Sequence, residues 1–186
     1  MILMEDLIDN RMQIAFLGGG CFWCLEAAFS RLSAIQQVES GYMGGEIENP
    51  TYQQVCGGDT GHAEVVKVVF DSKNLSYKDI LRIFFCIHDP TTLNRQGNDV
   101  GSQYRSVIFF QNDPQEKAAL EIIREMEVAK LYENPLVTEV CKAEEFFRAE
   151  DYHQGYYDSN TSQPYCQYVI SPKIEKLKKL WADVLR

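Results

Sequence analysis

The sequence has no excess of positive charge. Its 18 lysines and arginines are outnumbered by 27 aspartates and glutamates, which gives a formal net charge of −9. Binding to nucleic acid or to an anionic membrane surface depends on basic side chains that gather phosphates. The only basic cluster, "KLKKL" near the C-terminus, is typical of the solvent-facing side of a helix. We therefore expect neither kind of partner.

Long apolar runs are also missing. The N-terminal stretch "MILMEDLIDNRMQ" turns acidic at Glu5 and has no basic region before an apolar segment. It is therefore typical of neither a signal peptide nor a membrane span, and we expect a cytoplasmic protein. No internal repeat is present, and 186 residues of which 45% are hydrophobic can bury one core. We predict a single domain over residues 1–186.

Histidine is scarce, with three residues in the chain. A structural zinc site usually combines two pairs of cysteine or histidine ligands at regular spacing. Cys21 and Cys24 form one such pair, but only Cys56 and His62, in a glycine-rich stretch, are available as a second. We expect no metal and no organic cofactor. A zinc-stabilised binding module held by these four residues is the non-enzymatic alternative.

Cysteine, by contrast, is abundant for a chain in a reducing compartment, where repeated thiols indicate chemistry more often than bridging. Cys86 follows the apolar pattern of a predicted helix and Cys141 lies in a predicted strand, so we interpret both as structural. Cys56 has no assigned role. Cys166 lies in the polar, turn-rich "SQPYCQYV", where we expect a mobile segment that can carry a thiol to a partner.

Periodicity and turn residues predict an α+β domain. Predicted strands cover 13–17, 64–70, 104–110 and 136–142, and predicted helices begin near 21 and cover 76–87, 113–131 and the residues after 171. Ser76 and Asp79 are spaced as a capping box, and Asp113 is the expected cap of the third helix. Residues 41–61 and 89–103 are expected to be long functional loops.

The order of these elements predicts a mixed sheet. The strands at 64–70 and 104–110 are joined through a helix, which favours a parallel pair and places Glu64 and Tyr104 at the same edge. Cys21 follows the end of its strand, so it reaches that edge only if the first strand is antiparallel to the other two. This arrangement would gather all three residues.

Cys21 follows three glycines and begins a helix, where free N–H groups and the helix dipole favour an anion. A thiol there can have its pKa lowered from ~8.5 to about 3.5–7.5, as a nucleophile requires. The alternative is a buried cysteine that packs as a small hydrophobe. Cys24 lies one turn further on the same side and can form a bridge with Cys21.

Phe22 and Trp23 lie between these two cysteines. Aromatic faces make favourable contacts with the S–CH₃ end of methionine-like groups, so the two rings can form the wall of a pocket for a small apolar group. Ordinary core packing is the alternative for either ring.

Glu64 shares strand parity with Val66, Val68 and Phe70, so its carboxyl group points inward if that face is the core. Burial would raise its pKa and keep it protonated, as a general acid must be. A strand end open to water is the alternative.

Tyr52, Tyr104 and Asp99 lie in the segments around this edge. The two tyrosines can supply hydroxyl donors, and Asp99 can orient one of them or a water molecule. For any single tyrosine of the ten in the chain, a core or surface role is the alternative.

Four motifs in order carry a resemblance to a known family: "GCFWCLE", "NPTYQQVCGGDTGHAEVVKVVFD", "HDPTTLNRQGNDVGSQYRSVIF" and "AEDYHQGYY". Together they resemble the A-type peptide methionine sulfoxide reductases, from about Gly18 to Cys166. The resemblance implies a two-layer, ferredoxin-like α+β sandwich with a mixed sheet. It also implies reduction of the S-epimer of methionine sulfoxide, free or in proteins, as a repair of oxidative damage.

The resemblance also implies roles for single residues. Cys21 matches the nucleophile, Glu64 matches the acid that protonates the sulfoxide oxygen, and Tyr52 and Tyr104 match the donors to that oxygen, with Asp99 among the polar residues nearby. Phe22 and Trp23 match the pocket for the substrate methyl group.

The implied cycle forms a sulfenic acid on Cys21 and then an intramolecular disulfide, which thioredoxin reduces. Cys166, in a C-terminal segment of about 158–186 that ends in a helix, matches the recycling cysteine of many members. Many members have glycine where this chain has Cys24, and a further cysteine in a glycine-rich tail that this chain lacks. Cys166 and Cys24 are therefore both candidates for the resolving thiol. We expect a monomer.

A general thiol–disulfide oxidoreductase built on Cys21 and Cys24 is the enzymatic alternative. It would turn over a disulfide substrate without any sulfoxide. In such an enzyme Glu64 and the tyrosines would have no role in the reaction.

Overall fold

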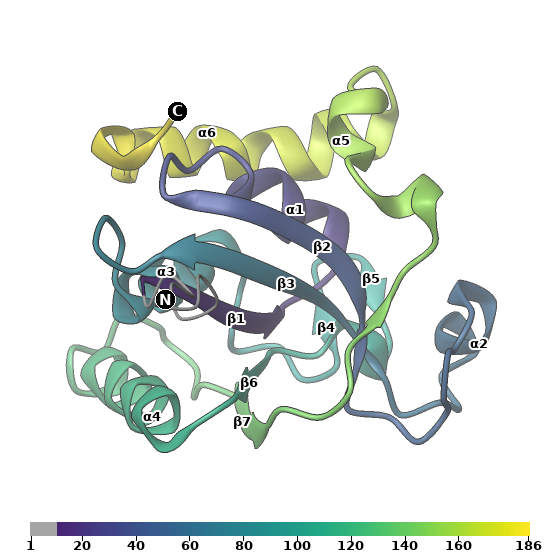
Figure 1. Ribbon diagram of the computed structural model, residues 1–186, viewed down its shortest axis with the longest axis horizontal. Helices are drawn as coiled ribbons and strands as arrows, with labels where there is room; N and C mark the ends of the chain where they lie inside the picture. The colour runs from purple at the N-terminus through teal and green to yellow at the C-terminus, as the bar shows by residue number, and fades with distance from the viewer. Residues whose placement is uncertain (1–10) are drawn as a thin grey trace, which may run out of the picture.

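The computed structural model describes residues 11–186, and its centre is a six-stranded sheet in the order β7-β6-β1-β3-β2-β8 (Figure 1). A separate two-stranded ribbon pairs β4 with β5. The strands are β1 (Met12–Gly18), β2 (Ile35–Met43), β3 (Ala63–Asp71), β4 (Arg95–Gln96), β5 (Asp99–Val100), β6 (Val107–Phe110), β7 (Glu139–Lys142) and β8 (Phe147–Arg148).

The sheet is mixed, as the sequence predicts. Strand β1 is antiparallel to both of its neighbours, β3 and β6, and β6 is parallel to β7. The expectation of a direct pair between β3 and β6 is wrong, because β1 lies between them. The two strands still run in the same direction, so their starts share one edge with the end of β1.

The helices are α1 (Phe22–Phe29), α2 (Tyr52–Gly57), α3 (Tyr77–Ile87), α4 (Asp113–Val128), α5 (Tyr156–Ser159) and α6 (Ser171–Leu180). Helix α3 begins with the predicted capping box, in which Ser76 and Asp79 exchange hydrogen bonds. The predicted cap of α4 is wrong by one residue. The side chain of Asn112 accepts from the Gln115 N–H, and Asp113 lies in the first turn.

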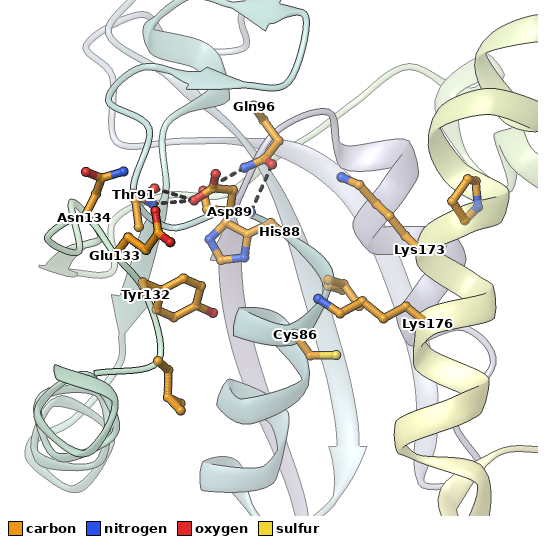
Figure 2. Close-up of a pocket in the computed structure, with 13 residues that line it drawn as sticks. Cys86, His88, Asp89, Thr91, Gln96, Tyr132, Glu133, Asn134, Lys173 and Lys176 are labelled. Carbon is orange, nitrogen blue, oxygen red and sulfur yellow. Dashed lines mark hydrogen bonds between the residues drawn. The ribbon is translucent and has the colours of Figure 1, made fainter. Parts of the chain in front are cut away.

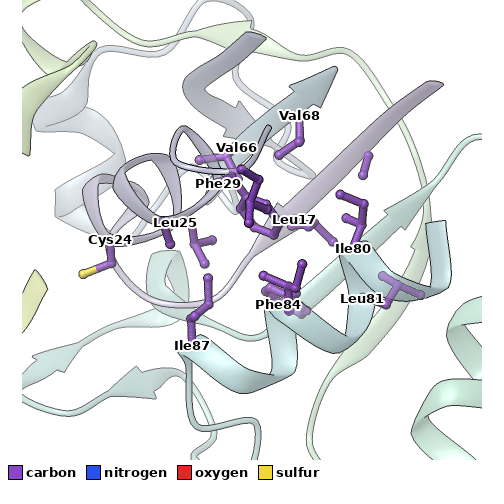
Figure 3. Close-up of a cluster of buried hydrophobic side chains, with 14 of the residues drawn as sticks. Leu17, Cys24, Leu25, Phe29, Val66, Val68, Ile80, Leu81, Phe84 and Ile87 are labelled. Atoms are coloured by element: carbon purple, nitrogen blue, oxygen red, sulfur yellow. The ribbon is translucent and has the colours of Figure 1, made fainter. Parts of the chain in front are cut away.

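The longer helices pack against one face of the sheet (Figure 1). Strand residues such as Leu17, Val66 and Val68 meet Phe29 of α1 and Phe84 of α3 there, as Figure 3 shows. The opposite face carries a smaller cluster around Phe16, Met43 and Phe109, against which Phe146 packs. The alternation along each strand therefore assigns Glu64, which has the parity of Val66, to the helix-covered face.

A predicted loop contains secondary structure, and a predicted strand is shorter than expected. Residues 41–61 include the end of β2 and all of α2, whose cap Thr51 accepts from the Gln54 N–H. The predicted strand at 104–110 is shorter, because Tyr104 ends a 3₁₀ turn, η1 (Ser102–Tyr104), three residues before β6 begins. Tyr104 therefore sits in a turn beside the sheet edge.

The expectations for the N-terminal stretch, apart from its last residues, lie outside the described residues. Within residues 11–186, no helix has the length and apolarity needed to span a bilayer. The final helix is expected to follow Ser171 and Pro172, but it begins at Ser171 and holds Pro172 in its first turn. Ile174 and Leu177 are buried, and the helix ends at Leu180.

Candidate active site

Glu64 is enclosed at the start of β3. Its side chain is 1% exposed, and Oε2 accepts a hydrogen bond of 2.9 Å from the backbone N–H of Phe22 in the first turn of α1. Burial raises the pKa of this carboxyl group to about 8, which the hydrogen bond from Phe22 offsets only in part. The inward orientation and the raised pKa predicted from strand parity are both present.

Cys21 is the N-cap of α1 and lies beside Glu64. The turn from β1 into the helix passes through Gly20 at φ +87°, a conformation that favours glycine. The thiol is 7% exposed and its side chain is within hydrogen-bonding reach of the Glu64 carboxyl group. The geometry therefore brings the predicted nucleophile and the predicted acid into contact.

The expectation of a lowered thiol pKa at Cys21 is wrong. Burial raises that pKa well above its usual value, and the neighbouring Glu64 and Cys24 raise it further. A backbone N–H at the helix start and the Tyr165 hydroxyl act in the opposite direction without offsetting these effects. The helix N-terminus does stabilise a thiolate, but the loss of hydration around the buried sulfur destabilises the thiolate by more.

Tyr52, on α2, and Tyr104, in η1, lie close enough to Glu64 for its charge to act on their hydroxyl groups. Both are half-buried, and the pKa of each is raised by burial, with a further contribution from Glu64. Their hydroxyl groups therefore stay protonated and can donate. The Tyr52 hydroxyl also has a hydrogen bond to Cys56, which is exposed one helical turn further along α2.

Phe22 and Trp23 differ in their surroundings. Phe22 is fully buried, and its ring centroid lies 5.8 Å from that of Tyr42. Trp23 is half-buried, stacks on Tyr156 with ring centroids 3.6 Å apart, and donates from Nε1 to Nδ1 of His153 at 3.1 Å. Core packing thus accounts for Phe22, whereas Trp23 has the partial exposure that a pocket wall needs.

Several supporting residues were not singled out from the sequence. Glu150 accepts from the Tyr42 hydroxyl at 3.0 Å and from the Tyr52 backbone N–H at 2.8 Å. His153 fixes the Trp23 ring, and its own ring lies 4.5 Å from that of Tyr52. The stretch "AEDYHQGYY" could have pointed to these residues, because it places a carboxylate, an imidazole and aromatic rings within a few positions of one another.

Asp99 contacts a different tyrosine from the two that we expected it to orient. It accepts a hydrogen bond of 2.7 Å from the Tyr165 hydroxyl, so it orients a tyrosine other than Tyr52 or Tyr104. The Tyr165 oxygen is in turn 3.8 Å from the Cys24 sulfur. Tyr165 was not predicted, although it immediately precedes Cys166 in the sequence.

The expectation that Cys166 lies in a mobile, polar segment is wrong. Cys166 begins a π-helical turn (Cys166–Ile170) that continues into α6, and it is fully buried with Ile170 and Leu177. Apolar residues recur at helical spacing through the polar stretch, so the turn packs onto the core. Cys86 and Cys141 are partly buried, and all six cysteines are free thiols.

Both ring nitrogens of His62 contact backbone groups of the same loop. Its Nδ1 accepts from the Gly45 N–H at 3.1 Å and its Nε2 lies 2.8 Å from the Ile47 carbonyl oxygen. Both ring nitrogens are therefore used within the loop. Among residues 11–186 no three histidine, cysteine or acidic side chains are grouped as metal ligands. The zinc-binding alternative accordingly lacks its predicted donor set.

A cavity of about 580 Å³ lies elsewhere, between the C-terminal end of α3 and α6 (Figure 2). Cys86 and His88 line one side, and Lys173 and Lys176 extend into it from α6. Cys21, Glu64 and the two predicted tyrosine donors are not among its lining residues. The catalytic candidates therefore form a separate, tightly enclosed cluster.

Comparison with known proteins gives a consistent result. The sequence model described as "Peptide methionine sulfoxide reductase" matches residues 13–185. The peptide methionine sulfoxide reductase MsrA of Saccharolobus solfataricus is 54% identical over 94% of this chain and 98% of its own length. The reduced form of Mxr1 from Saccharomyces cerevisiae is 34% identical, with a TM-score of 0.77 over 85% of this chain and 91% of that one.

Mxr1 has also been solved in complex with Trx2, and that structure is similar in fold, with a TM-score of 0.55 at 24% identity over 80% of this chain and 86% of that one. The family model covers every predicted site residue, and the relative from Saccharolobus solfataricus also covers almost the whole chain. The chain belongs to the peptide methionine sulfoxide reductase family.

Proposed function

We propose that this protein reduces the S-epimer of methionine sulfoxide, free or in proteins, and so repairs oxidised proteins as a peptide-methionine (S)-S-oxide reductase. The observation that carries this function is the contact between the Cys21 thiol and the Glu64 carboxyl group, whose pKa burial raises to about 8. A nucleophilic sulfur and a protonated acid lie side by side. Reduction of a sulfoxide needs both at once.

The chemical step moves one oxygen atom. The Cys21 sulfur attacks the sulfoxide sulfur while Glu64 gives its proton to the oxygen. The proton of the Cys21 thiol returns to Glu64, and the oxygen passes to Cys21 as a hydroxyl group when methionine leaves. Cys21 is oxidised to a sulfenic acid and the sulfoxide is reduced to a thioether. Tyr52 and Tyr104 donate hydrogen bonds to the oxygen as negative charge develops on it.

The substrate's methyl group has an aromatic wall in this arrangement. Trp23 offers the more accessible ring, and the stack on Tyr156 and the bond to His153 hold it in one orientation. Phe22 lies behind it in the core. Contact between a thioether methyl group and an aromatic face is favourable, which suits a methyl sulfoxide entering here.

The cycle is completed by a second thiol, either Cys24 or Cys166, which condenses with the sulfenic acid to form a disulfide. Thioredoxin then reduces the disulfide by exchange. The similarity to Mxr1, which has been solved with Trx2, supports a thioredoxin as the reductant. We place the chain in the cytoplasm as a monomer, and its six free thiols support a reducing compartment.

We also assign residues 1–186 to a single catalytic domain with a ferredoxin-like core. The segment order β1, α1, β2, β3, α3, β6 and the strand order β6-β1-β3-β2 support this, because both match the split βαβ arrangement. Strands β7 and β8 extend the two edges. The shared edge of this core then carries Cys21, Glu64 and Tyr104.

A single-turnover assay without added reductant tests the function. Wild-type protein is mixed with a peptide that contains either the S- or the R-epimer of methionine sulfoxide. We expect about one equivalent of methionine from the S-epimer and none from the R-epimer. Cys21→Ser should release none. Stoichiometric methionine from Cys21→Ser would remove Cys21 as the nucleophile.

The same preparation should be offered a peptide disulfide in the absence of sulfoxide. A general thiol–disulfide oxidoreductase would reduce it at the rate seen with a sulfoxide. We expect no comparable turnover, since such an enzyme has no use for the buried acid.

A further inference from the structure

The hydroxyl group of Tyr165 connects the second cysteine of the C-x-x-C pair to a carboxylate. Tyr165 donates to Oδ2 of Asp99 at 2.7 Å, so its oxygen keeps a lone pair for the thiol of Cys24, whose sulfur is 3.8 Å away. Cys24 is 1% exposed. A buried thiol therefore has a defined route by which its proton can reach a partly exposed carboxylate.

Lys173 supplies a positive charge to the same thiol. Figure 2 shows its side chain extending from α6 into the cavity that Cys86 and Gln96 also line. Burial raises the pKa of Cys24, and the charge of Lys173, together with contacts to the Tyr165 hydroxyl and Lys173 ammonium groups, lowers it. Figure 3 shows the Cys24 sulfur directed away from the packed side chains of Leu25 and Phe29.

The backbone holds the two cysteines one turn apart at the helix start. The Cys24 N–H donates to the Cys21 carbonyl oxygen at 3.0 Å, which closes the first turn of α1. Residues three apart on a helix have Cβ atoms about 5 to 6 Å apart, and a disulfide needs them at about 3.5 to 4.5 Å. Cys21 is an N-cap in an extended conformation, so a change at this residue can close the gap without unwinding the helix that follows.

Cys166 has none of these features. It is fully buried among Ile170, Ile174 and Leu177, and burial is the only influence on its pKa, which it raises. The Ser171 hydroxyl donates to the Cys166 carbonyl oxygen, which fastens the turn to the start of α6. For this thiol to reach Cys21, the turn would have to unpack from the core.

We propose that Cys24, and not Cys166, is the resolving thiol, that Tyr165 and Asp99 take up its proton, and that Lys173 is a positioning residue for the resulting thiolate. This inference rests on the proposed function, which supplies the sulfenic acid on Cys21. The glycine found at this position in many relatives is replaced here by a thiol with its own activating groups.

The step balances without any further reagent. The Cys24 proton passes to the Tyr165 oxygen as the Tyr165 proton passes to Asp99, and the Cys24 sulfur attacks the sulfur of the Cys21 sulfenic acid. The S–S bond forms as the S–O bond breaks. The leaving hydroxide takes a proton from Glu64, which regains one from solvent, and leaves as water.

Peptide mapping of the wild-type protein tests the assignment directly. After one turnover without reductant, free thiols are alkylated and the chain is cut with trypsin. Arg11 and Arg31 bound one peptide, 12–31, that holds both Cys21 and Cys24, whereas Cys166 lies in peptide 149–173. We expect peptide 12–31 to carry an internal disulfide, two hydrogen masses lighter and unalkylated.

Two outcomes of the mapping would overturn the proposal. One is peptide 12–31 cross-linked to 149–173 or to any other peptide. The other is a persistent sulfenic acid that reacts with dimedone in wild-type protein. Methionine is measured in the same quenched samples, so failure of the first step is seen separately as missing methionine and would count against the proposed function.

Rates of disulfide formation test the supporting residues. Tyr165→Phe and Lys173→Gln should each slow this step about tenfold at pH 7, since raising the thiol pKa by one unit lowers the thiolate fraction tenfold. Tyr168→Phe, in the same segment and 80% exposed, and Lys176→Gln, one turn along α6, are the matched controls and should leave the rate unchanged.

The pH profile distinguishes an electrostatic role for Lys173 from a structural one. The titratable groups that face Cys24 are Cys21 on the same turn, Tyr165 and Asp99 from the loops, and Lys173 from α6. In Lys173→Gln the rise in rate with pH should shift upward by about one unit. A uniform loss of rate at every pH, or no change at all, would overturn the role of Lys173.

Discussion

The backbone N–H of Phe22 donates to Oε2 of Glu64 over 2.9 Å, and this bond joins β3 to the first turn of α1. It fixes the acid relative to the residue that follows Cys21. The proposed nucleophile and acid are therefore positioned by a backbone contact that no substitution at Phe22 other than proline removes.

Replacing Glu64 tests the acid. Glu64→Gln keeps an acceptor for the Phe22 N–H but has no proton to transfer. We expect methionine release in the first turnover to slow by a factor of roughly 10² to 10⁴, measured by rapid quenching. Glu26→Gln is the matched control, because Glu26 is a second buried carboxyl group, on α1, and accepts from the Gly155 N–H. Equal rates for Glu64→Gln and wild type would remove Glu64 from the mechanism.

The same substitution should change the pH dependence of stability. Between pH 4.5 and about 8 folded protein holds a proton on Glu64 that the unfolded chain has released. The free energy of unfolding therefore falls as pH rises, by up to about 1.4 kcal/mol per unit. Glu64→Gln loses this slope. In urea titrations it should match wild type near pH 5 and exceed it near pH 8, and equal stability at pH 8 would show that Glu64 ionises normally.

Protonation of His153 should release the Trp23 ring. Burial lowers the pKa of His153 from its usual 6.5, so Nδ1 accepts from the Trp23 indole at neutral pH. Acid removes that acceptor. In a Trp181→Phe background, where Trp23 is the remaining tryptophan, we expect its fluorescence to change with a midpoint below pH 6.5. His153→Gln should abolish the transition, and its persistence there would point to another group.

Glu150 should act on the chemical step, because it positions Tyr52. It holds both the Tyr42 hydroxyl and the Tyr52 backbone, so Glu150→Ala frees the start of α2. A hydrogen bond to a charged acceptor contributes about 1.5 kcal/mol, and losing the Tyr52 contact should therefore lower kcat about tenfold with a smaller change in KM. Glu145→Ala, an exposed neighbour in sequence, is the control. A rise confined to KM would contradict this positioning role.

Cys166 should behave as a core residue. Cys166→Ser places a hydroxyl among apolar side chains and should lower the free energy of unfolding by about 1 to 3 kcal/mol. Cys166→Ala should cost less, since it buries no polar atom. Chemical denaturation of both variants measures the difference, and a serine variant as stable as the alanine variant would show that the site is hydrated.

Strand parity with Val66 and Val68 predicted that Glu64 points inward, with a strand end open to water as the alternative, and burial of the carboxyl group decides between the two. The start of α1 at Cys21 followed from the glycines before it. The direction of β1 relative to its neighbours also followed, since only an antiparallel first strand brings Cys21 to the edge where Glu64 lies.

Other features depended on contacts that no local pattern contains. Strand β2 alternates poorly, because Gln36 and Gln37 at its start are exposed and its far half is buried on both faces. Its assignment needs the pairing with β3. The raised pKa at Cys21 likewise arises from burial and from Glu64, 43 positions away in the sequence, whereas the helix start alone suggested the opposite direction.

The high pKa of the enclosed Cys21 has a consequence for survival under oxidative stress. Peroxides attack thiolates that they can reach, and in the resting protein this sulfur is both protonated and covered. In the mechanism proposed above a sulfoxide side chain differs, because it enters the site and takes the proton of Glu64 as it delivers its oxygen. The protein can thus remain in working order in the very conditions that create its substrate.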